Sequence, residues 1–193
     1  MSKIHLVIQG CGDIAKKHAR TLKSFQDLCT ISFSSRDGKK SEEYRKKFGG
    51  LKSFSSLEKA LVDSSVDGVL LCTPHQTHAP LGMQVLQSGK KLIVEKPLAL
   101  SVEEGKRLVD FARSQNIYMN VAENYHYRPA LLKLEEWIQG GVLGKIQYVR
   151  INKLHQRKTA PTGWRLEKES MGAGIFIDGG IHWVNVLDRK SVV

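Results

Sequence analysis

The sequence predicts an α/β fold whose N-terminal part, residues 1–121, is a Rossmann-type, doubly wound parallel sheet. Strand-like apolar runs alternate with amphipathic segments throughout this part of the chain. Strands that are apolar along their whole length and separated by helices are typical of a parallel sheet with both faces covered. A glycine-rich turn between the first run and the first amphipathic segment supports the same fold, because it suits the opening of a βαβ unit.

Strands and helices are expected to alternate from the first residues onward. The expected strands are Lys3–Gln9, Cys29–Ser34, Val66–Cys72, Lys91–Glu95 and Ile117–Val121. The expected helices are Ile14–Phe25, Lys39–Phe48, Leu57–Val62, Ala79–Ser88 and Val102–Ser114. Ser101 with Glu104 three residues later forms a capping-box pattern at the start of the last helix, where apolar residues recur at helical spacing.

The pattern changes after Val121, and we expect a second, incomplete α+β (open-sheet) domain over residues 122–187. Pro129 suits the first turn of a helix that ends near Gly140. The segment from Gly144 to Ile151 has the alternation of a long strand that opens this domain. A final helix is expected to follow residues 172–174.

Composition and charge exclude several classes of protein. The 193 residues include 30 Lys and Arg against 19 Asp and Glu, a net charge of +11. The basic residues are spread along helix-like segments without a basic tail or interleaved aromatic residues, so we expect no nucleic-acid partner. Cys11, Cys29 and Cys72 form neither a zinc spacing nor a disulfide framework, which predicts no metal site and a cytoplasmic setting. No apolar stretch approaches the ~20 residues that span a membrane, and we expect no signal peptide before the first strand.

The first chemical motif is Gly10, Gly12 and Ala15, a G-x-G-x-x-A pattern between a strand and a helix. The first glycine permits the tight turn, the second lets the backbone approach a pyrophosphate, and the small third residue lets the helix pack against the strand. Asp13 and Ile14 open this helix, and its N-terminal N–H groups are available to an anion. The motif therefore predicts a dinucleotide-binding site.

The end of the second strand predicts which dinucleotide is bound. An acidic residue there normally holds the ribose hydroxyls of NAD, whereas this chain has Ser35 and Arg36 at the expected position. A serine with an arginine suits a 2′-phosphate, which a guanidinium can bind in bidentate fashion. The interpretation favours NADP. NAD stays the alternative, with Asp37 serving as the acid one or two positions late.

Further polar residues follow the later strands. Thr73, Pro74 and His78 come after Val66–Cys72, at the sheet edge where ligands of such folds bind, although His78 could equally be a capping or packing residue. Glu95 and Lys96 come at the end of the next strand-like run, and the family resemblance described below implies that they also lie at the dinucleotide.

Taken together in order, these motifs resemble the Gfo/Idh/MocA family, named for glucose-fructose oxidoreductase and inositol dehydrogenase. The resemblance covers residues 3 to about 187. It depends on the residues Gly10–Ala15, Thr73-Pro74 with His78, Glu95-Lys96-Pro97, Glu123-Asn124 with Arg128-Pro129, and Asp178-x-Gly-x-His182.

The resemblance implies an NAD(P)-dependent oxidoreductase that moves a hydride between nicotinamide and a sugar, polyol or related hydroxyl or carbonyl compound. Lys96, Asp178 and His182 are the implied catalytic residues: a neutral His182 can take the proton, Lys96 can stabilise the alkoxide, and Asp178 can orient the substrate or the imidazole. Their spacing would place Asp178 and His182 on one face of a helix. The implied substrate-side residues are Tyr125, Arg128, Trp164, Arg165 and Asn185, the last standing where the family often has an aspartate.

Alternatives remain open at the level of sequence. One is a non-catalytic NAD(P)-sensing regulator of the same fold, and another is a reductase of a non-sugar substrate such as an imine or a tetrapyrrole. Family members are far longer, so the chain is expected to be truncated, with 188–193 a non-native tail. The full-length protein is expected to be a homo-oligomer.

Overall fold

The computed structural model describes residues 2–154, 162–172, 174 and 176–191. It divides into an N-terminal unit, Met1–Ala122, and a C-terminal unit, Glu123–Val193. None of the helices among the described residues is long and apolar enough to cross a membrane.

The N-terminal unit is a parallel sheet in the order β3-β2-β1-β4-β5-β6. The strands are β1 (Ile4–Gln9), β2 (Cys29–Ser34), β3 (Ser53–Phe54), β4 (Gly68–Leu71), β5 (Lys91–Glu95) and β6 (Met119–Ala122). The helices are α1 (Asp13–Lys23), α2 (Gly38–Phe48), α3 (Leu57–Leu61), η1 (His75–Thr77), α4 (His78–Gln87) and α5 (Val102–Ser114). The strand order reverses direction at β1 and β4, which confirms the predicted doubly wound Rossmann fold.

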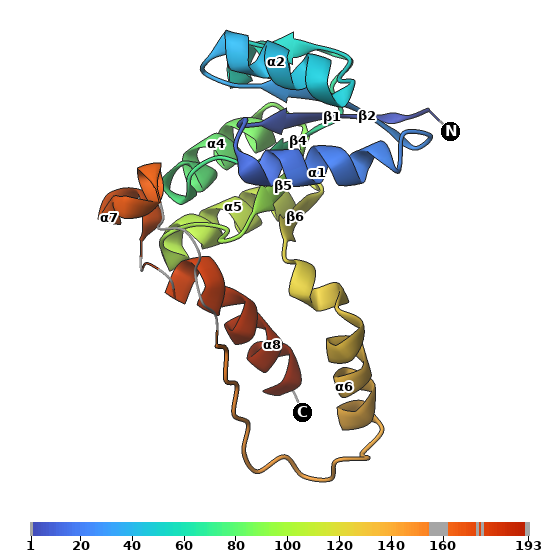
Figure 1. Cartoon of the computed structure of the whole chain (residues 1–193), viewed down its shortest axis with the longest axis vertical. Helices are drawn as coiled ribbons and strands as arrows, with labels where there is room; N and C mark the ends of the chain where they lie inside the picture. Colours follow the sequence, from blue (N-terminus) through green and yellow to red (C-terminus); the bar gives the residue numbers. More distant parts are fainter. Residues whose placement is uncertain (1, 155–161, 173, 175, 192–193) are drawn as a thin grey trace. The chain divides into compact units, whose positions relative to one another are not determined.

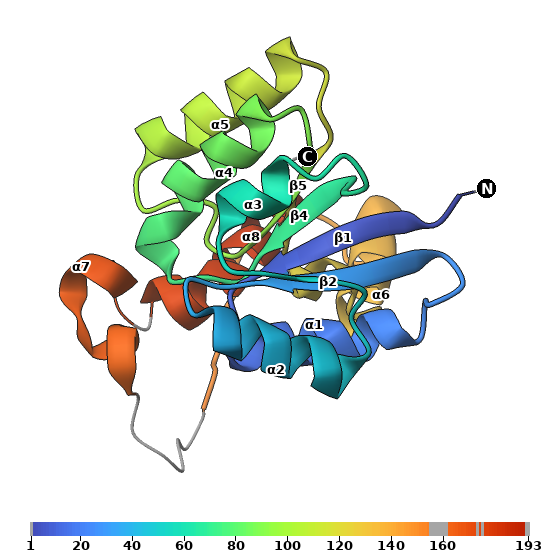
Figure 2. The same ribbon diagram turned by 90° about the horizontal axis from the view of Figure 1, so that it is seen from above.

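Helices cover both faces of this sheet (Figures 1 and 2), with α1 and α2 on one face and α3, α4 and α5 on the other. Neighbouring residues of β1 accordingly pack into two different hydrophobic cores, one on each face of the sheet. Val7 packs with Val69, Leu92 and Leu108, whereas Ile8 packs with Ala15, Phe33 and Leu70. Burial on both faces explains why the strands are apolar throughout instead of alternating.

Most of the expected elements of this unit are present. β2, β5 and α5 have the predicted bounds, and the Ser101 hydroxyl accepts the Glu104 N–H at 3.2 Å, as the capping pattern predicted. The sequence analysis missed β3, because two residues are too few to show any periodicity.

The C-terminal unit contains η2 (Asn124–Tyr127), α6 (Pro129–Gln139), η3 (Gly163–Leu166), α7 (Lys168–Met171), η4 (Phe176–Gly180) and α8 (Ile181–Ser191). Pro129 opens α6 as predicted. Within this unit α8 packs against η2 and α6.

One prediction for this unit is wrong. The segment 144–151 is not a strand: none of the described residues of the unit pairs with it, and Ile146, Tyr148 and Val149 are exposed. Apolar alternation makes a strand only where a neighbouring strand supplies the ladder of hydrogen bonds. The expected final helix is present, but it begins with a π-helical turn: Asp178 lies in η4 and His182 in the first turn of α8.

Candidate functional site

The glycine turn lies at the carboxyl edge of the sheet, between β1 and α1. Gly10 has a φ of +97°, and a Cβ there would lie 2.7 Å from the carbonyl oxygen of Cys72. Its N–H donates to Ser34 O at 2.8 Å. A Cβ on Gly12, by contrast, would meet no described atom within 4 Å. Gly10 is therefore required by the fold, and the space beside Gly12 is open to a ligand that approaches the backbone.

The start of α1 is arranged as a dinucleotide helix requires. Ala15 is fully buried, and Ile14 is half-buried against the same core. The exposed Asp13 carboxylate accepts from Lys16 Nζ at 2.8 Å. Gly12 precedes the helix without a side-chain cap, so the first N–H groups of α1 are not satisfied by a cap from that residue.

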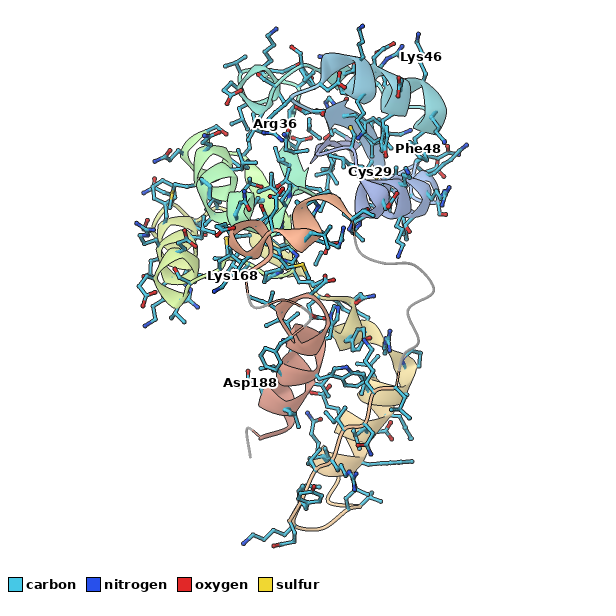
Figure 3. The ribbon with its side chains drawn as sticks, turned by 60° about the vertical axis from the view of Figure 1, so that its left-hand side comes forward. Cys29, Arg36, Lys46, Phe48, Lys168 and Asp188 are labelled. Atoms are coloured by element: carbon cyan, nitrogen blue, oxygen red, sulfur yellow. The ribbon has the colours of Figure 1, made fainter. Side chains whose placement is uncertain are left out.

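The residues after β2 have distinct roles. Asp37 caps α2, its Oδ1 accepting the N–H groups of Lys39 at 3.0 Å and Lys40 at 3.4 Å. Ser35 is half-buried and its hydroxyl accepts the Asp37 N–H at 3.2 Å. Arg36 is exposed, and Figure 3 shows it at the opposite end of α2 from Lys46 and Phe48. The acidic residue of this segment is thus engaged by the backbone of its own helix.

Charges from this segment also act on Cys11, the residue between the two glycines. Burial raises the pKa of the Cys11 thiol to about 11, with Lys40 lowering it and Asp37 raising it more weakly. A buried thiol with such a pKa is protonated at neutral pH and is not a nucleophile. Cys11 is therefore a packing residue of the glycine turn.

His78 connects two loops at the same edge. The side chain is fully buried, with Nδ1 2.6 Å from Pro97 O and Nε2 2.9 Å from Thr73 O. Burial lowers its pKa, and the two carbonyl oxygens oppose that effect. Thr73 Oγ1 accepts from Thr77 Oγ1 at 2.7 Å, and Pro74 precedes η1. His78 thus holds the loops after β4 and β5 together from within the protein.

The Glu95-Lys96-Pro97 motif ends β5 at this edge. Glu95 is only 7% exposed, and its Oε1 lies 2.6 Å from Nε2 of His18 on α1. Its Oε2 accepts the Lys96 N–H at 3.2 Å. Lys96 is half-buried and the Lys96–Pro97 peptide bond is cis. The Glu95 carboxylate therefore links the backbone at Lys96 to α1, a role that the sequence analysis did not assign.

In the C-terminal unit, His182 lies in a cluster with Glu123 and Tyr125. Its Nδ1 is 2.6 Å and 2.7 Å from the two carboxylate oxygens of Glu123. The Tyr125 ring stacks on the imidazole with centroids 4.2 Å apart and planes at 7°, and the Arg128 guanidinium lies 3.5 Å from the Tyr125 centroid. The sequence analysis used Glu123 only as a motif residue, and its contact with His182, 59 positions away, has no local signal.

Asp178 belongs to a different group. Arg165 Nε lies 3.9 Å from Asp178 Oδ2, and the Arg165 guanidinium lies 4.5 Å from the Trp164 ring centroid. Asn185, on α8, has a buried Oδ1 without a hydrogen-bond partner among the described residues. The predicted catalytic residues are thus divided between the units, with Lys96 in the first and Asp178 and His182 in the second.

Comparisons with known protein families match both parts of the chain. The family profile described as "Oxidoreductase family, NAD-binding Rossmann fold" matches residues 4–123. The profile of the GFO/IDH/MocA C-terminal domain matches residues 131–189.

Similar curated proteins include a levoglucosan dehydrogenase from Pseudarthrobacter phenanthrenivorans, 31% identical over 75% of this chain and 38% of its own length. A myo-inositol 2-dehydrogenase from Thermotoga maritima is 28% identical over 90% of this chain and 50% of its own. The chain thus spans half or less of the length of these two relatives.

Solved structures show the same fold. A levoglucosan dehydrogenase in complex with NADH and L-sorbose superposes with a TM-score of 0.87 at 25% identity, over 98% of this chain and 54% of that one. An oxidoreductase from Thermotoga maritima gives a TM-score of 0.86 at 30% identity, over 97% and 60% of the two chains. With its NAD-binding Rossmann fold and both family domains matched, the chain belongs to the Gfo/Idh/MocA oxidoreductase family.

Proposed function

We propose that the full-length protein is an NAD(P)-dependent dehydrogenase or reductase that acts on the hydroxyl or carbonyl group of a sugar, polyol or related compound. The observation that carries the proposal is the carboxyl edge of the sheet. There Gly10 makes the sharp turn, the space beside Gly12 is open, and Lys96 directly follows β5, a parallel strand of the same sheet. A binding turn for a pyrophosphate and an ammonium group at one edge suit a dinucleotide and a reacting oxygen.

Side chains of the protein would transfer the proton while the bound nicotinamide accepts or donates the hydride. In the oxidation direction, His182 takes the proton from the substrate hydroxyl. Lys96 stabilises the negative charge that develops on that oxygen. Asp178, beside Arg165, binds a neighbouring hydroxyl of the substrate. In the reduction direction the same proton returns from His182 to the carbonyl oxygen.

We further propose NADP as the preferred cofactor. Asp37, the acidic residue that could have bound the ribose hydroxyls of NAD, accepts two N–H groups of α2. Arg36 is exposed and follows Ser35 in the sequence, and a serine with an arginine suits a 2′-phosphate. Because solved relatives contain NAD or NADH, NAD is the competing choice, and direct binding decides between them.

The substrate class is proposed from the relatives and from the residues of the C-terminal unit. The named relatives act on levoglucosan, myo-inositol and glucose 6-phosphate. Tyr125, Arg128, Trp164, Arg165 and Asn185 are the proposed substrate contacts of this chain. The Trp164 ring lies beside the Arg165 guanidinium, and such a pair suits the apolar face and the hydroxyl edge of a sugar ring.

The proposal is tested on the full-length protein with two variants, Lys96→Ala and His182→Ala, and with Lys106→Ala on α5 as the control, because Lys106 is exposed. NADPH and NADH are titrated by nucleotide fluorescence, and turnover is screened on a panel of sugars and polyols. We expect nucleotide binding in every protein, with turnover lost only in the first two variants. Binding without turnover on any substrate would instead support a nucleotide sensor. Failure to bind either nucleotide would refute the dinucleotide site.

A further inference from the structure

We propose that Glu123 is the positioning residue of His182: its carboxylate fixes the tautomer and the orientation of the imidazole. This inference rests on the proposed function, since it concerns how the proposed base is prepared to take a proton. Asp178, which the sequence analysis considered for this role, is not the carboxylate that the structure places on the imidazole.

The first step of the argument is the contact itself. Nδ1 of His182 lies within 2.7 Å of both oxygens of Glu123, and each side chain is 12% exposed. A hydrogen bond to a charged group is shorter and stronger than a neutral one, and partial removal from water strengthens it further. The contact is therefore strong enough to hold the imidazole in one orientation.

The second step is the position of the proton. A carboxylate oxygen can only accept, so Nδ1 must carry the hydrogen that is donated to Glu123. In a neutral imidazole the other nitrogen, Nε2, is then unprotonated. Nε2 has no hydrogen-bond partner among the residues that the structure describes. Glu123 thus selects the tautomer in which Nε2 is free to accept a proton from a substrate hydroxyl.

The third step is that Glu123 is itself fixed. Its Oε1 accepts the backbone N–H of Tyr125 at 2.9 Å, which places the carboxylate at the start of η2. The Tyr125 ring, which is buried, stacks on His182, and Arg128 lies on the Tyr125 ring. The carboxylate and the stacked ring approach the imidazole from two directions, so the ring can neither flip nor tilt without breaking one of them.

The first experiment measures kcat and KM of the full-length protein with Glu123→Gln, Glu123→Asp and the control Glu136→Gln. Glu136 is an exposed glutamate of α6 that pairs with Lys133 at 2.7 Å. Glutamine can donate to Nδ1 and so favour the wrong tautomer, for which we expect a loss in kcat of about 10²–10⁴-fold with little change in nucleotide affinity. Glu123→Asp restores part of the loss, and Glu136→Gln retains the parent kcat.

The second experiment does not depend on turnover. Nitrogen-15 NMR of histidine-labelled protein distinguishes a protonated from an unprotonated ring nitrogen. We expect His182 with the proton on Nδ1 in the parent protein and a shift of that proton to Nε2 in Glu123→Gln. A parent His182 protonated on Nε2 alone would overturn the inference even if Glu123→Gln failed to fold.

The two proposals fail in different ways. If His182→Ala loses turnover but Glu123→Gln keeps the parent kcat, the positioning role of Glu123 is refuted and the role of His182 stands. If His182→Ala keeps its turnover, the proposed base is wrong. The tautomer measurement then still reports whether Glu123 orients the ring.

Discussion

The hydroxyl of Tyr44, on α2, donates a hydrogen bond to the carbonyl oxygen of Gly12 at 3.3 Å. The same ring packs edge-on against Phe33 of β2, with centroids 5.8 Å apart. Tyr44 thereby connects the glycine turn to the helix that begins just after Arg36. The position of the open glycine, and with it the approach of a pyrophosphate, depends on a residue outside the glycine motif.

Removing only that hydroxyl gives the first prediction. Tyr44→Phe keeps the ring in the core but leaves the Gly12 carbonyl with one contact fewer, and a typical net hydrogen bond contributes about 1 kcal/mol. We expect the Kd for the nucleotide to rise about fivefold. Fluorescence titration checks this, with Tyr118→Phe as the control. Tyr118 is exposed, and its hydroxyl accepts a hydrogen bond from Asn120, two residues away, and not from any residue of the glycine turn. Equal affinities of the Tyr44 and Tyr118 variants would contradict the proposed anchoring.

A second prediction concerns Gly10. An alanine there would combine a strained φ with a Cβ 2.7 Å from Cys72 O. Gly89 also has a positive φ, +75°, but a Cβ there would meet no described atom within 4 Å. We expect Gly89→Ala to cost about 1 kcal/mol of stability through backbone strain alone. Gly10→Ala should cost more and should also abolish nucleotide binding.

Denaturant unfolding and fluorescence titration separate these two effects. The comparison isolates the clash with Cys72, since both glycines share the strained backbone conformation. A Gly10→Ala protein that unfolds and binds nucleotide like Gly89→Ala would show that the turn has room for a side chain.

The sequence predicted the sheet well because strand-like runs and glycine turns are local signals. β2 and β5 have the bounds expected from apolar runs, and the G-x-G-x-x-A pattern lies where a dinucleotide turn belongs. The C-terminal unit was less predictable, because 144–151 depends on a pairing partner and η4 on tertiary packing. The contacts of Glu123 with His182 and of His18 with Glu95 join residues 59 and 77 positions apart. Periodicity carries no information about such pairs.

The third prediction tests the cofactor preference. Arg36→Ala should lower the affinity for NADPH about 10- to 100-fold, because a hydrogen bond to a charged group contributes about 1.5–3 kcal/mol. The affinity for NADH should stay the same, since NADH lacks the 2′-phosphate. Lys46→Ala is the matched control, a cation removed from the far end of α2 (Figure 3). A parallel loss of NADH affinity would mean that Arg36 acts on the nucleotide as a whole.

The last prediction uses the raised pKa of Cys11, about 11, which results mainly from burial. At pH 8 only about one thiol in a thousand would be the reactive thiolate, and the fraction grows about tenfold with each pH unit. Mass spectrometry after iodoacetamide treatment should therefore find the partly exposed Cys29 modified first and Cys11 only at high pH. Cys72, whose pKa burial also raises, should behave like Cys11.

The raised pKa of Cys11 also determines how the stability of the folded protein depends on pH. The folded-state pKa of Cys11 exceeds the unfolded value, so the folded protein holds this proton more tightly. The contribution to stability is therefore full below about pH 9 and is lost as the pH rises towards 11. The difference between the free energies of unfolding of the parent and Cys11→Ala proteins should therefore decrease by about 1 kcal/mol when the pH is raised from 8 to 10. A difference that stays constant over this range would show that the thiol is not protected by burial.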